Sequence, residues 1–447
     1  MLKIMMLAVY SLSPLIPAIL FFSAPTGALT KGLNAVAVTF GMVAYVCFCW
    51  QFILVSRVKF IERVVGQDRL IRFHLYVALG ALACAGLHSS LIPGLKGNGL
   101  QASIGQLALN IFIYISIFSA IFLSDFFVTK IPHAKKWRDL LVARIRLDRK
   151  WSLYAHRVLA LALALACLHI MLAPVQGRAL FKGSIFIYWA VAMSVYGYRA
   201  FPRKRRLGRR PYRVTEVRPE SKDAWTVSLE PASGQASISF APGQFIYFTP
   251  LTGKLQREEH PFSISSSPRE NISVTVKSLG DFTSKIGGLE RGDYVRVDGP
   301  YGRFSYRLVR RGAELVFIAG GIGVTPFLSM LQDLSREAPD RKVILLWGAK
   351  HEKDLIRVKE IEALADRLPN LSFYPVLSRE TSYSGLRGRI DKNLLVRILG
   401  PQPAGGAGDA QREFFICAPP VVIDSVARFL QQLGVAKRKI HFEKFSF

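Results

Sequence analysis

Acidic residues are scarce in the first half of this sequence of 447 residues. Residues 1–213 contain 27 Lys and Arg but only 5 Asp and Glu, whereas residues 214–447 contain 32 and 26. The basic half is also the more apolar half, a combination that is typical of a membrane protein with basic loops. A nucleic-acid-binding protein would need this charge on a soluble surface, so the sequence argues against nucleic acid as a partner.

Cysteine is also scarce, and its pattern excludes a cysteine-based metal site. None of the five cysteines has the spacing of a metal site. Four of them lie in apolar runs, where a buried small apolar side chain is the ordinary role. The sequence likewise contains nothing that resembles an EF-hand or a docking site for a cytosolic activator. We therefore expect activity without an obligatory activator protein.

Long apolar runs fill the first half, and each has about the 20 residues that a helix needs to cross a bilayer. They lie near residues 4–24, 34–55, 71–92, 105–128, 152–173 and 184–201. The first run is followed by small residues, so it is either a signal peptide or a retained helix, and we interpret it as a helix. The sequence thus predicts a six-helix transmembrane bundle in a multi-pass protein of the cell inner membrane.

The loops between these runs differ in charge and predict an orientation. The segments 57–72, 130–150 and 203–210 hold 5, 8 and 6 Lys and Arg, respectively. The loops on the other side hold only Lys31, Lys96, Arg178 and Lys182. Because positive loops stay inside, both chain ends are predicted to be cytoplasmic.

Four histidines lie within two of the apolar runs. His74 and His88 are 14 residues apart in one run. His156 and His169 are 13 residues apart in the other, so each run carries two imidazoles separated by roughly 20 Å. An imidazole in hydrocarbon costs free energy unless it has a use. Two stacked haems would use all four histidines as iron ligands. Because the sequence has no CxxCH motif, these haems would be b-type.

The orientation places His74 and His156 at the inner level and His88 and His169 at the outer level. An ideal helix returns to nearly the same face after 14 residues but misses it by roughly 140° after 13. The haem interpretation therefore needs a local distortion or different ring rotamers in the second run. The alternative is four unrelated histidines that hydrogen-bond to neighbouring helices.

The second half changes character from Tyr212. Short β-rich segments separated by Gly, Pro and Ser turns predict a small antiparallel barrel up to about residue 310. From Glu314, apolar strands near 314–320, 343–348, 371–377 and 414–417 alternate with helical stretches. This alternation predicts a doubly wound α/β domain with a parallel sheet. The predicted domains are therefore 1–210, 211–310 and 311–447.

A glycine-rich turn links the first strand of the α/β domain to a helix. It contains Gly320, Gly321, Gly323, Val324, Thr325 and Pro326. Glycines let backbone amides approach a pyrophosphate, and the helix N-terminus favours its charge. A plain tight turn is the alternative reading of this motif.

Several motifs together resemble a known family. HPFSISSSP (260–268), GDFTSKI (280–286), VDGPYGRF (297–304), AGGIGVTPF (319–327) and FFICAPP (414–420) occur in the order found in the ferredoxin–NADP reductase superfamily. With the six-helix, four-histidine region in front, the whole chain resembles the NADPH oxidase / ferric reductase family. This resemblance implies FAD, NAD(P)H and two b-type haems as cofactors.

The resemblance also implies roles for individual residues. His260, Pro261, Phe262 and Ser263 would line the flavin ring, with the Ser263 hydroxyl as a hydrogen-bonding group. Val276, Lys277, Ser278 and Thr283 would hold the ribityl and pyrophosphate part of FAD, and Phe447 would stack on the flavin. Cys417 and Pro419 would lie near the nicotinamide, although this chain has Ala418 where the family usually has Gly. Lys350, Ser378 and Arg379 would bind the 2′-phosphate of NADPH, with NADH as the alternative.

The expected activity is electron transfer from cytoplasmic NADPH through FAD and the haems to an acceptor on the opposite side of the bilayer. Dioxygen, which would give superoxide, is the first choice of electron acceptor. Lys31, near the outer end of the second helix, would stabilise the superoxide anion. A ferric chelate is the second choice. The third is a partner protein or a quinone that receives electrons from the chain.

Overall fold

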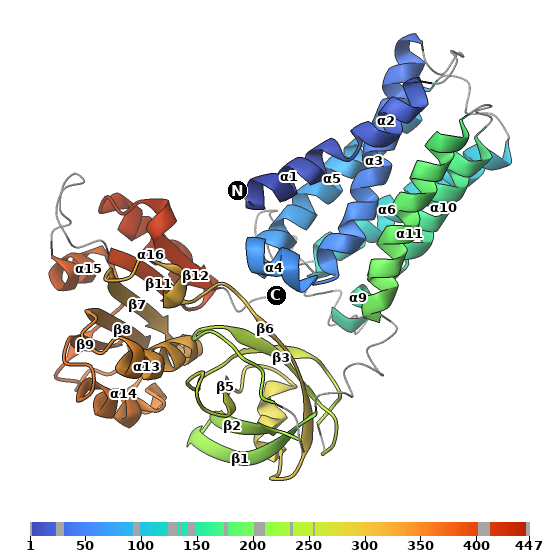
Figure 1. Ribbon diagram of the computed structural model, residues 1–447. Helices are drawn as coiled ribbons and strands as arrows, with labels where there is room; N and C mark the ends of the chain where they lie inside the picture. Colours follow the sequence, from blue (N-terminus) through green and yellow to red (C-terminus); the bar gives the residue numbers. More distant parts are fainter. Residues whose placement is uncertain are drawn as a thin grey trace. The chain divides into compact units, whose positions relative to one another are not determined.

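The chain folds into two compact units, which divide between Pro202 and Arg203. The computed structural model describes residues 2–23, 31–92, 99–123, 133, 136, 138, 140, 149–173, 178–200, 211–232, 236–253, 255–400 and 412–443. Figure 1 shows a helical unit followed by a unit built around two sheets.

The N-terminal unit is a bundle of helices. Its described helices are α1 (Leu2–Leu12), α2 (Leu15–Phe22), α3 (Gly32–Val55), α4 (Lys59–Val65), α5 (Gln67–Leu91), α6 (Leu100–Leu123), α9 (Arg149–Arg157), α10 (Leu159–Leu172) and α11 (Ala179–Ala200). Six segments are long and apolar enough to cross a membrane, by length and composition. These six segments correspond to the six apolar runs of the sequence.

Two of the predicted starts are wrong by about five residues. The fourth segment begins at Leu100 instead of near 105, and the sixth begins at Ala179 instead of near 184. Both helix starts were predicted too late because Gln101 and Lys182 are polar, although Gln101 is helical and Lys182 lies within α11. The Lys182 ammonium donates to carbonyl oxygens at the end of α10, which satisfies its charge inside an apolar segment.

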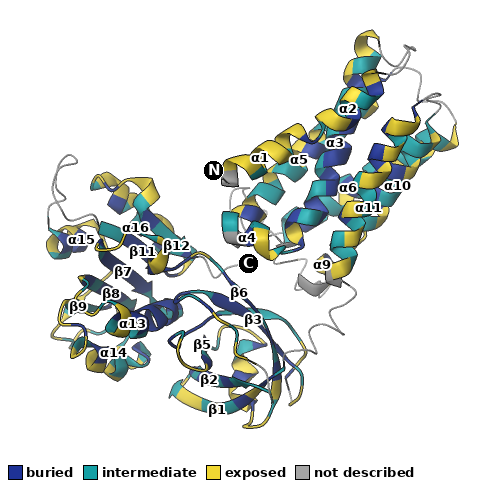
Figure 2. Ribbon diagram, viewed as in Figure 1, coloured by how far each residue is buried: buried dark blue, intermediate teal, exposed yellow. Residues whose placement is uncertain are grey.

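The first segment packs into the bundle through its helix break at residues 13–14. The Trp50 Nε1–H donates to the Ser13 hydroxyl at 2.9 Å, and the Tyr188 hydroxyl donates to the Ser13 carbonyl at 2.8 Å. Figure 2 shows exposed residues along the outside of the bundle and buried residues where the helices face one another. Large apolar side chains, such as Leu79 and Ile187, are among the exposed ones.

A break at Val158 separates α9 from α10 and lies between His156 and His169. The Val158 amide donates to Ala155, three residues back, whereas an α-helix bonds four residues back. This is a local distortion of the kind that the 13-residue spacing required. The two histidines therefore do not lie on one ideal helix.

The C-terminal unit begins with an antiparallel sheet. Its strands are β1 (Pro211–Ser221), β2 (Ala224–Pro231), β3 (Phe245–Pro250), β4 (His260–Ser263), β5 (Ile272–Lys277) and β6 (Tyr294–Tyr301), in the order β4-β3-β6-β1-β2-β5. A bridge between Ile264 and Val274 joins the chain after β4 to β5, so the sheet curls around one apolar core. The predicted antiparallel β domain is confirmed.

The second sheet is parallel. Its strands are β7 (Glu314–Gly320), β8 (Val343–Ala349), β9 (Leu371–Leu377), β10 (Leu386–Arg387), β11 (Arg412–Cys417) and β12 (Ile440–Glu443), in the order β10-β9-β8-β7-β11-β12. Helices α13 (Thr325–Glu337) and α14 (Val358–Ala365) cover one face, and α15 (Lys392–Leu399) and α16 (Pro420–Gln432) cover the other (Figure 1). The predicted doubly wound α/β domain is confirmed, whereas the domain boundaries at 210 and 310 stay predictions.

Candidate functional site

The four histidines of the N-terminal unit meet as two pairs. The ring centroids of His74, on α5, and His156, on α9, are 6.1 Å apart. Those of His88, on α5, and His169, on α10, are 6.2 Å apart. Two imidazoles that each bind one metal ion at about 2 Å have centroids roughly 6.3 Å apart. Both pairs therefore have about the separation that two imidazoles bound to one metal ion would have.

Hydrogen bonds fix the tautomer of the second pair. His88 Nδ1 lies 2.9 Å from the Ala37 carbonyl oxygen, and His169 Nδ1 lies 2.8 Å from the Gln101 carbonyl oxygen. A carbonyl only accepts, so each Nδ1 carries a proton, and in the neutral imidazole Nε2 then keeps its lone pair. A lone pair on Nε2 is what a metal ion requires of a histidine ligand.

The first pair has a different environment. His156 Nδ1 lies 3.0 Å from the Ser119 hydroxyl. His74 Nδ1 is buried and has no hydrogen-bond partner among the described residues. No group of three or more His, Cys, Asp or Glu side chains within those residues could hold a metal ion. Two imidazoles per ion, with the other positions supplied by a macrocycle, is the arrangement that fits.

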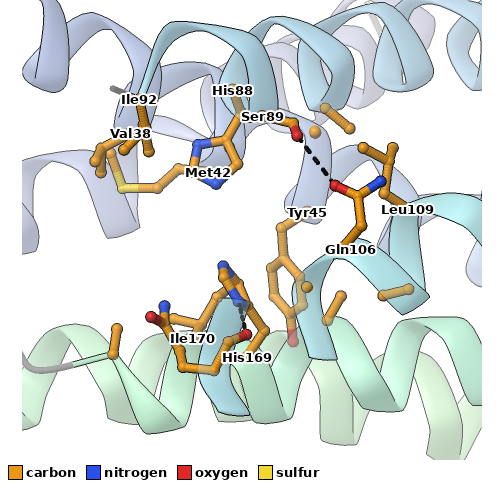
Figure 3. Close-up of a pocket in the computed structure, with 18 of the residues that line it drawn as sticks. Val38, Met42, Tyr45, His88, Ser89, Ile92, Gln106, Leu109, His169 and Ile170 are labelled. Atoms are coloured by element: carbon orange, nitrogen blue, oxygen red, sulfur yellow. Dashed lines mark hydrogen bonds between the residues drawn. The ribbon is translucent and has the colours of Figure 1, made fainter. Parts of the chain in front are cut away.

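A cavity of about 540 Å³ lies beside His88 and His169. In Figure 3 the two imidazoles project toward each other from facing helices, with Met42 and Tyr45 on the wall between them. Ser89 and Gln106, joined by a hydrogen bond of 3.4 Å, are among the polar residues of the lining. The volume is within the range of roughly 300–1,000 Å³ that small-molecule and cofactor sites occupy.

Lys31 is exposed at the start of α3. It precedes Ala37, whose carbonyl holds His88, by six residues, so it belongs to the end of α3 nearest the second histidine pair. Its predicted role toward superoxide is not tested by its position alone.

In the C-terminal unit, β4 carries the residues predicted to line the flavin. His260, Pro261 and Phe262 form this edge strand of the first sheet. The His260 ring stacks on Phe282 at 3.9 Å between centroids. The Ser263 side chain is buried, and its hydroxyl has no hydrogen-bond partner in the described protein. A buried hydroxyl without a partner is costly, so Ser263 fits a position that hydrogen-bonds a ligand.

The second group of predicted FAD residues follows β5. The Val276 side chain is buried in the barrel core, so only its backbone is available to a ligand. The Lys277 ammonium lies 3.2 Å from the Asp223 carboxylate. Burial alone would raise the pKa of Asp223, but hydrogen bonds from Ser221 and Lys277 lower this pKa below its ordinary value.

Ser278 and Thr283 frame the loop between β5 and the 3-10 helix Thr283–Gly288. The Ser278 amide donates to the Asp223 carbonyl. The Thr283 hydroxyl accepts from the amides of Leu279 and Gly280 at 2.9 and 3.0 Å, which closes the loop. Thr283 therefore shapes the loop that is predicted to hold the ribityl and pyrophosphate part of FAD.

The glycine-rich turn connects β7 to α13, which begins at Thr325 and has Pro326 in its first turn. A methyl group at Gly323 would lie 2.1 Å from the Cys417 carbonyl oxygen. One at Gly320 would lie 2.7 Å from the Ala418 methyl group. Gly321 has a φ of +55°, which side chains rarely adopt. Each of these three positions therefore favours glycine on steric grounds. Gly320 in particular leaves space for the Ala418 methyl group, which this chain has where the family usually has glycine.

Cys417 ends β11 beneath this turn. Its thiol is fully buried, and burial together with the Glu443 carboxylate raises its pKa. Glu443 is paired in register with Cys417 on the neighbouring strand β12 and is itself buried. Sequence reasoning missed Glu443, although an acid within the aromatic segment HFEKF was a usable signal. Pro419 is exposed, and Phe447 lies outside the described residues.

The residues predicted to bind a 2′-phosphate lie where β8 and β9 end. The Ser378 amide and hydroxyl both donate to the Ala349 carbonyl, and the Arg379 amide donates to the Lys350 carbonyl. These bonds place Lys350, Ser378 and Arg379 together, and all three are exposed. Parallel sheets bind ligands at the carboxyl ends of their strands, which is where these side chains lie.

Comparisons with known proteins match the C-terminal unit. A family model described as an FAD-binding domain matches residues 214–305, and one described as an oxidoreductase NAD-binding domain matches residues 317–428. Ferredoxin–NADP reductase B of Sorangium cellulosum is 33% identical over 240 residues, which cover 52% of this chain and 96% of that reductase.

Two further matches cover similar parts of the chain. The toluate 1,2-dioxygenase electron transfer component of Pseudomonas putida is 27% identical over 237 residues, 52% of this chain and 66% of that protein. The solved FAD/NAD-binding domain of nitric oxide dioxygenase from Vibrio cholerae has a TM-score of 0.45 at 25% identity, over 53% of this chain and 98% of that domain.

The sequence motifs, the two sheets and the match to almost the whole of one reductase agree with one another. NAD(P)H and FAD are the pyridine nucleotide and flavin that such domains bind. The chain belongs to the ferredoxin–NADP reductase family and is an oxidoreductase that transfers electrons from NAD(P)H through FAD.

Proposed function

We propose that the chain is a transmembrane electron-transfer enzyme of the NADPH oxidase / ferric reductase type. It takes electrons from cytoplasmic NADPH through FAD and delivers them, by way of two b-type haems, to dioxygen on the opposite side of the membrane. The observation that carries this proposal is the matched pairing of His74 with His156 and of His88 with His169 at nearly equal ring separations.

A membrane location is supported by composition and by the surface of the bundle. Six segments are long and apolar enough to span a bilayer, and large apolar side chains lie on the outside of the bundle. The basic loops put the C-terminal unit in the cytoplasm. Two histidine levels roughly 20 Å apart suit a hydrocarbon core about 30 Å thick, which one redox centre would not bridge.

When bound, FAD accepts a hydride and releases single electrons, and the haems relay those electrons. The protein's own residues bind and orient these groups. Each histidine pair would hold one iron, and the hydrogen bonds at Nδ1 keep the rings of His88 and His169 in place. The Ser263 hydroxyl and the loop closed by Thr283 hold the flavin, with Phe447 proposed to stack on it.

The nucleotide binds along the carboxyl ends of the parallel strands. The turn from Gly320 to Pro326 presents backbone amides and the N-terminus of α13 to the pyrophosphate. Cys417 and Pro419 border the nicotinamide. Lys350 and Arg379 face the 2′-phosphate, which is the basis for proposing NADPH over NADH.

With dioxygen as the acceptor, the balanced reaction is NADPH plus two O₂ giving NADP⁺, H⁺ and two superoxide anions. The exposed ammonium of Lys31, at the end of α3 nearest His88, attracts an anion formed there. Cytochrome c or dye reduction that superoxide dismutase abolishes tests this acceptor. Faster anaerobic reduction of an Fe(III) chelate would instead identify a ferric reductase.

Similarity to an electron transfer component of an oxygenase favours a second candidate, in which a partner protein or a quinone takes the electrons. Slow turnover with both dioxygen and Fe(III) chelates, together with fast haem reduction by NADPH, would support this candidate. We also propose that no activator protein is required. Purified protein that stays inactive with NADPH and FAD until another protein is added would contradict that part.

A further inference from the structure

Two glycines lie against the imidazoles of the second histidine pair. A methyl group at Gly41, on α3, would be 2.8 Å from His88 Nδ1 and 3.0 Å from its Cε1. One at Gly105, on α6, would be 2.5 Å from His169 Nδ1 and 2.7 Å from its Cε1. Both imidazoles therefore occupy the space that a side chain on the neighbouring helix would fill.

The same spacing relates each glycine to the carbonyl that its histidine binds. Gly41 comes four residues after Ala37, the acceptor of His88, and Gly105 comes four residues after Gln101, the acceptor of His169. In an α-helix the Cα–Cβ bond tilts toward the N-terminus, so a side chain covers the turn before its own residue. A side chain at either glycine would cover the carbonyl four residues back.

We propose that Gly41 and Gly105 are positioning residues for the outer iron site. Each leaves a helix carbonyl open to the Nδ1–H of an axial histidine, which sets the ring orientation and the electron donation of that ligand. This inference rests on the proposed haem ligation. The arrangement occurs twice, on two different helices and for both ligands of one pair.

Among the described residues, the inner pair has neither a glycine nor a backbone carbonyl in this arrangement. His156 contacts the Ser119 hydroxyl, and His74 Nδ1 has no hydrogen-bond partner among the described residues. A carbonyl acceptor at Nδ1 makes an imidazole a stronger donor, which favours the oxidised form of a bound iron. The loss of either carbonyl contact should therefore shift the midpoint potential of the outer site to a more positive value and leave the inner site unchanged.

The test uses the full-length protein in detergent with three substitutions. Gly41→Ala and Gly105→Ala each force one ring to retreat by roughly 0.6–0.9 Å to reach the ordinary contact distance of 3.4 Å. Gly80→Ala, on α5, is the matched control because a methyl group there would meet nothing within 4 Å. Haem content, an anaerobic redox titration of the haem α-band and the low-spin EPR signals are measured for each variant.

The expected result is that Gly41→Ala and Gly105→Ala either lose one haem or change the potential and EPR signal of one haem. The other haem and the FAD content stay at the wild-type level, which shows that the variant has folded. Gly80→Ala should match the wild type. Wild-type titration and EPR signals in both glycine variants would overturn this inference alone, and a wild-type protein without haem would overturn the proposed function on which it rests.

Discussion

Substitution of Gly323 by alanine should abolish efficient reduction of the flavin by NADPH. The added methyl group would lie 2.1 Å from the Cys417 carbonyl oxygen and 2.7 Å from its carbon. Both are backbone atoms of β11, which is paired on both sides by β7 and β12, so no flexible side chain can move aside. The turn must shift by roughly 1 Å, and a displacement of that size in a binding site costs about a hundredfold in rate. Overpacking of this kind also destabilises a fold by about 1–3 kcal/mol.

The assay is stopped-flow reduction of bound FAD by NADPH without oxygen, followed by the flavin absorbance. The control is Gly348→Ala, since Gly348 lies beside Gly320 in the same sheet and its methyl group would make an ordinary contact of 3.4 Å with Ile390. We expect kcat/KM for flavin reduction to fall about a hundredfold in Gly323→Ala and to change little in Gly348→Ala. Equal rates in Gly323→Ala and the wild type would refute the assignment of this turn to the nucleotide.

Three further predictions concern the C-terminal unit. Arg307→Ala leaves the buried Asp333 carboxylate without the guanidinium that contacts both of its oxygens, so thermal release of FAD should show a destabilisation of about 2 kcal/mol. Arg379→Ala should lower kcat/KM for NADPH about tenfold and leave that for NADH unchanged, because only NADPH carries the phosphate; a parallel loss with both would contradict its role. Because the pKa of Cys417 is raised above its ordinary value of 9.0, its contribution to stability is fully present below pH 9 and declines above it. Cys417→Ala should therefore lose less stability than the wild type between pH 8 and pH 10, as measured by the same thermal release of FAD.

The meeting of the histidines was predictable because it depends on properties that a sequence carries. Loop charge predicts the helix directions, and the predicted directions decide which histidines are expected to share a level. The 13-residue spacing also indicated a distortion, which the structure has at Val158. How each ring is held was not predictable, since the carbonyls of Ala37 and Gln101 belong to neighbouring helices whose packing no local pattern encodes.

In the C-terminal unit, too, some features were predictable from the sequence and others were not. Strands such as β7 and β8 were predictable from short apolar runs bounded by turn residues, whereas β10 has only two residues and β12 has four. The pairing of Glu443 with Cys417 was not predictable, because it depends on the parallel register of β11 and β12. The steric role of Gly323 likewise depends on a strand that lies almost a hundred residues further along the chain.

The central claim is that the two histidine pairs hold two haems that NADPH reduces. A reduced-minus-oxidised optical spectrum of the purified protein, with NADPH as the only reductant, tests it most directly. We expect a b-type α-band, two haems per chain, and the loss of one haem in each of His74→Ala and His169→Ala. A spectrum that shows only flavin bleaching, with no haem band, would contradict the account and leave a flavoprotein with four structural histidines.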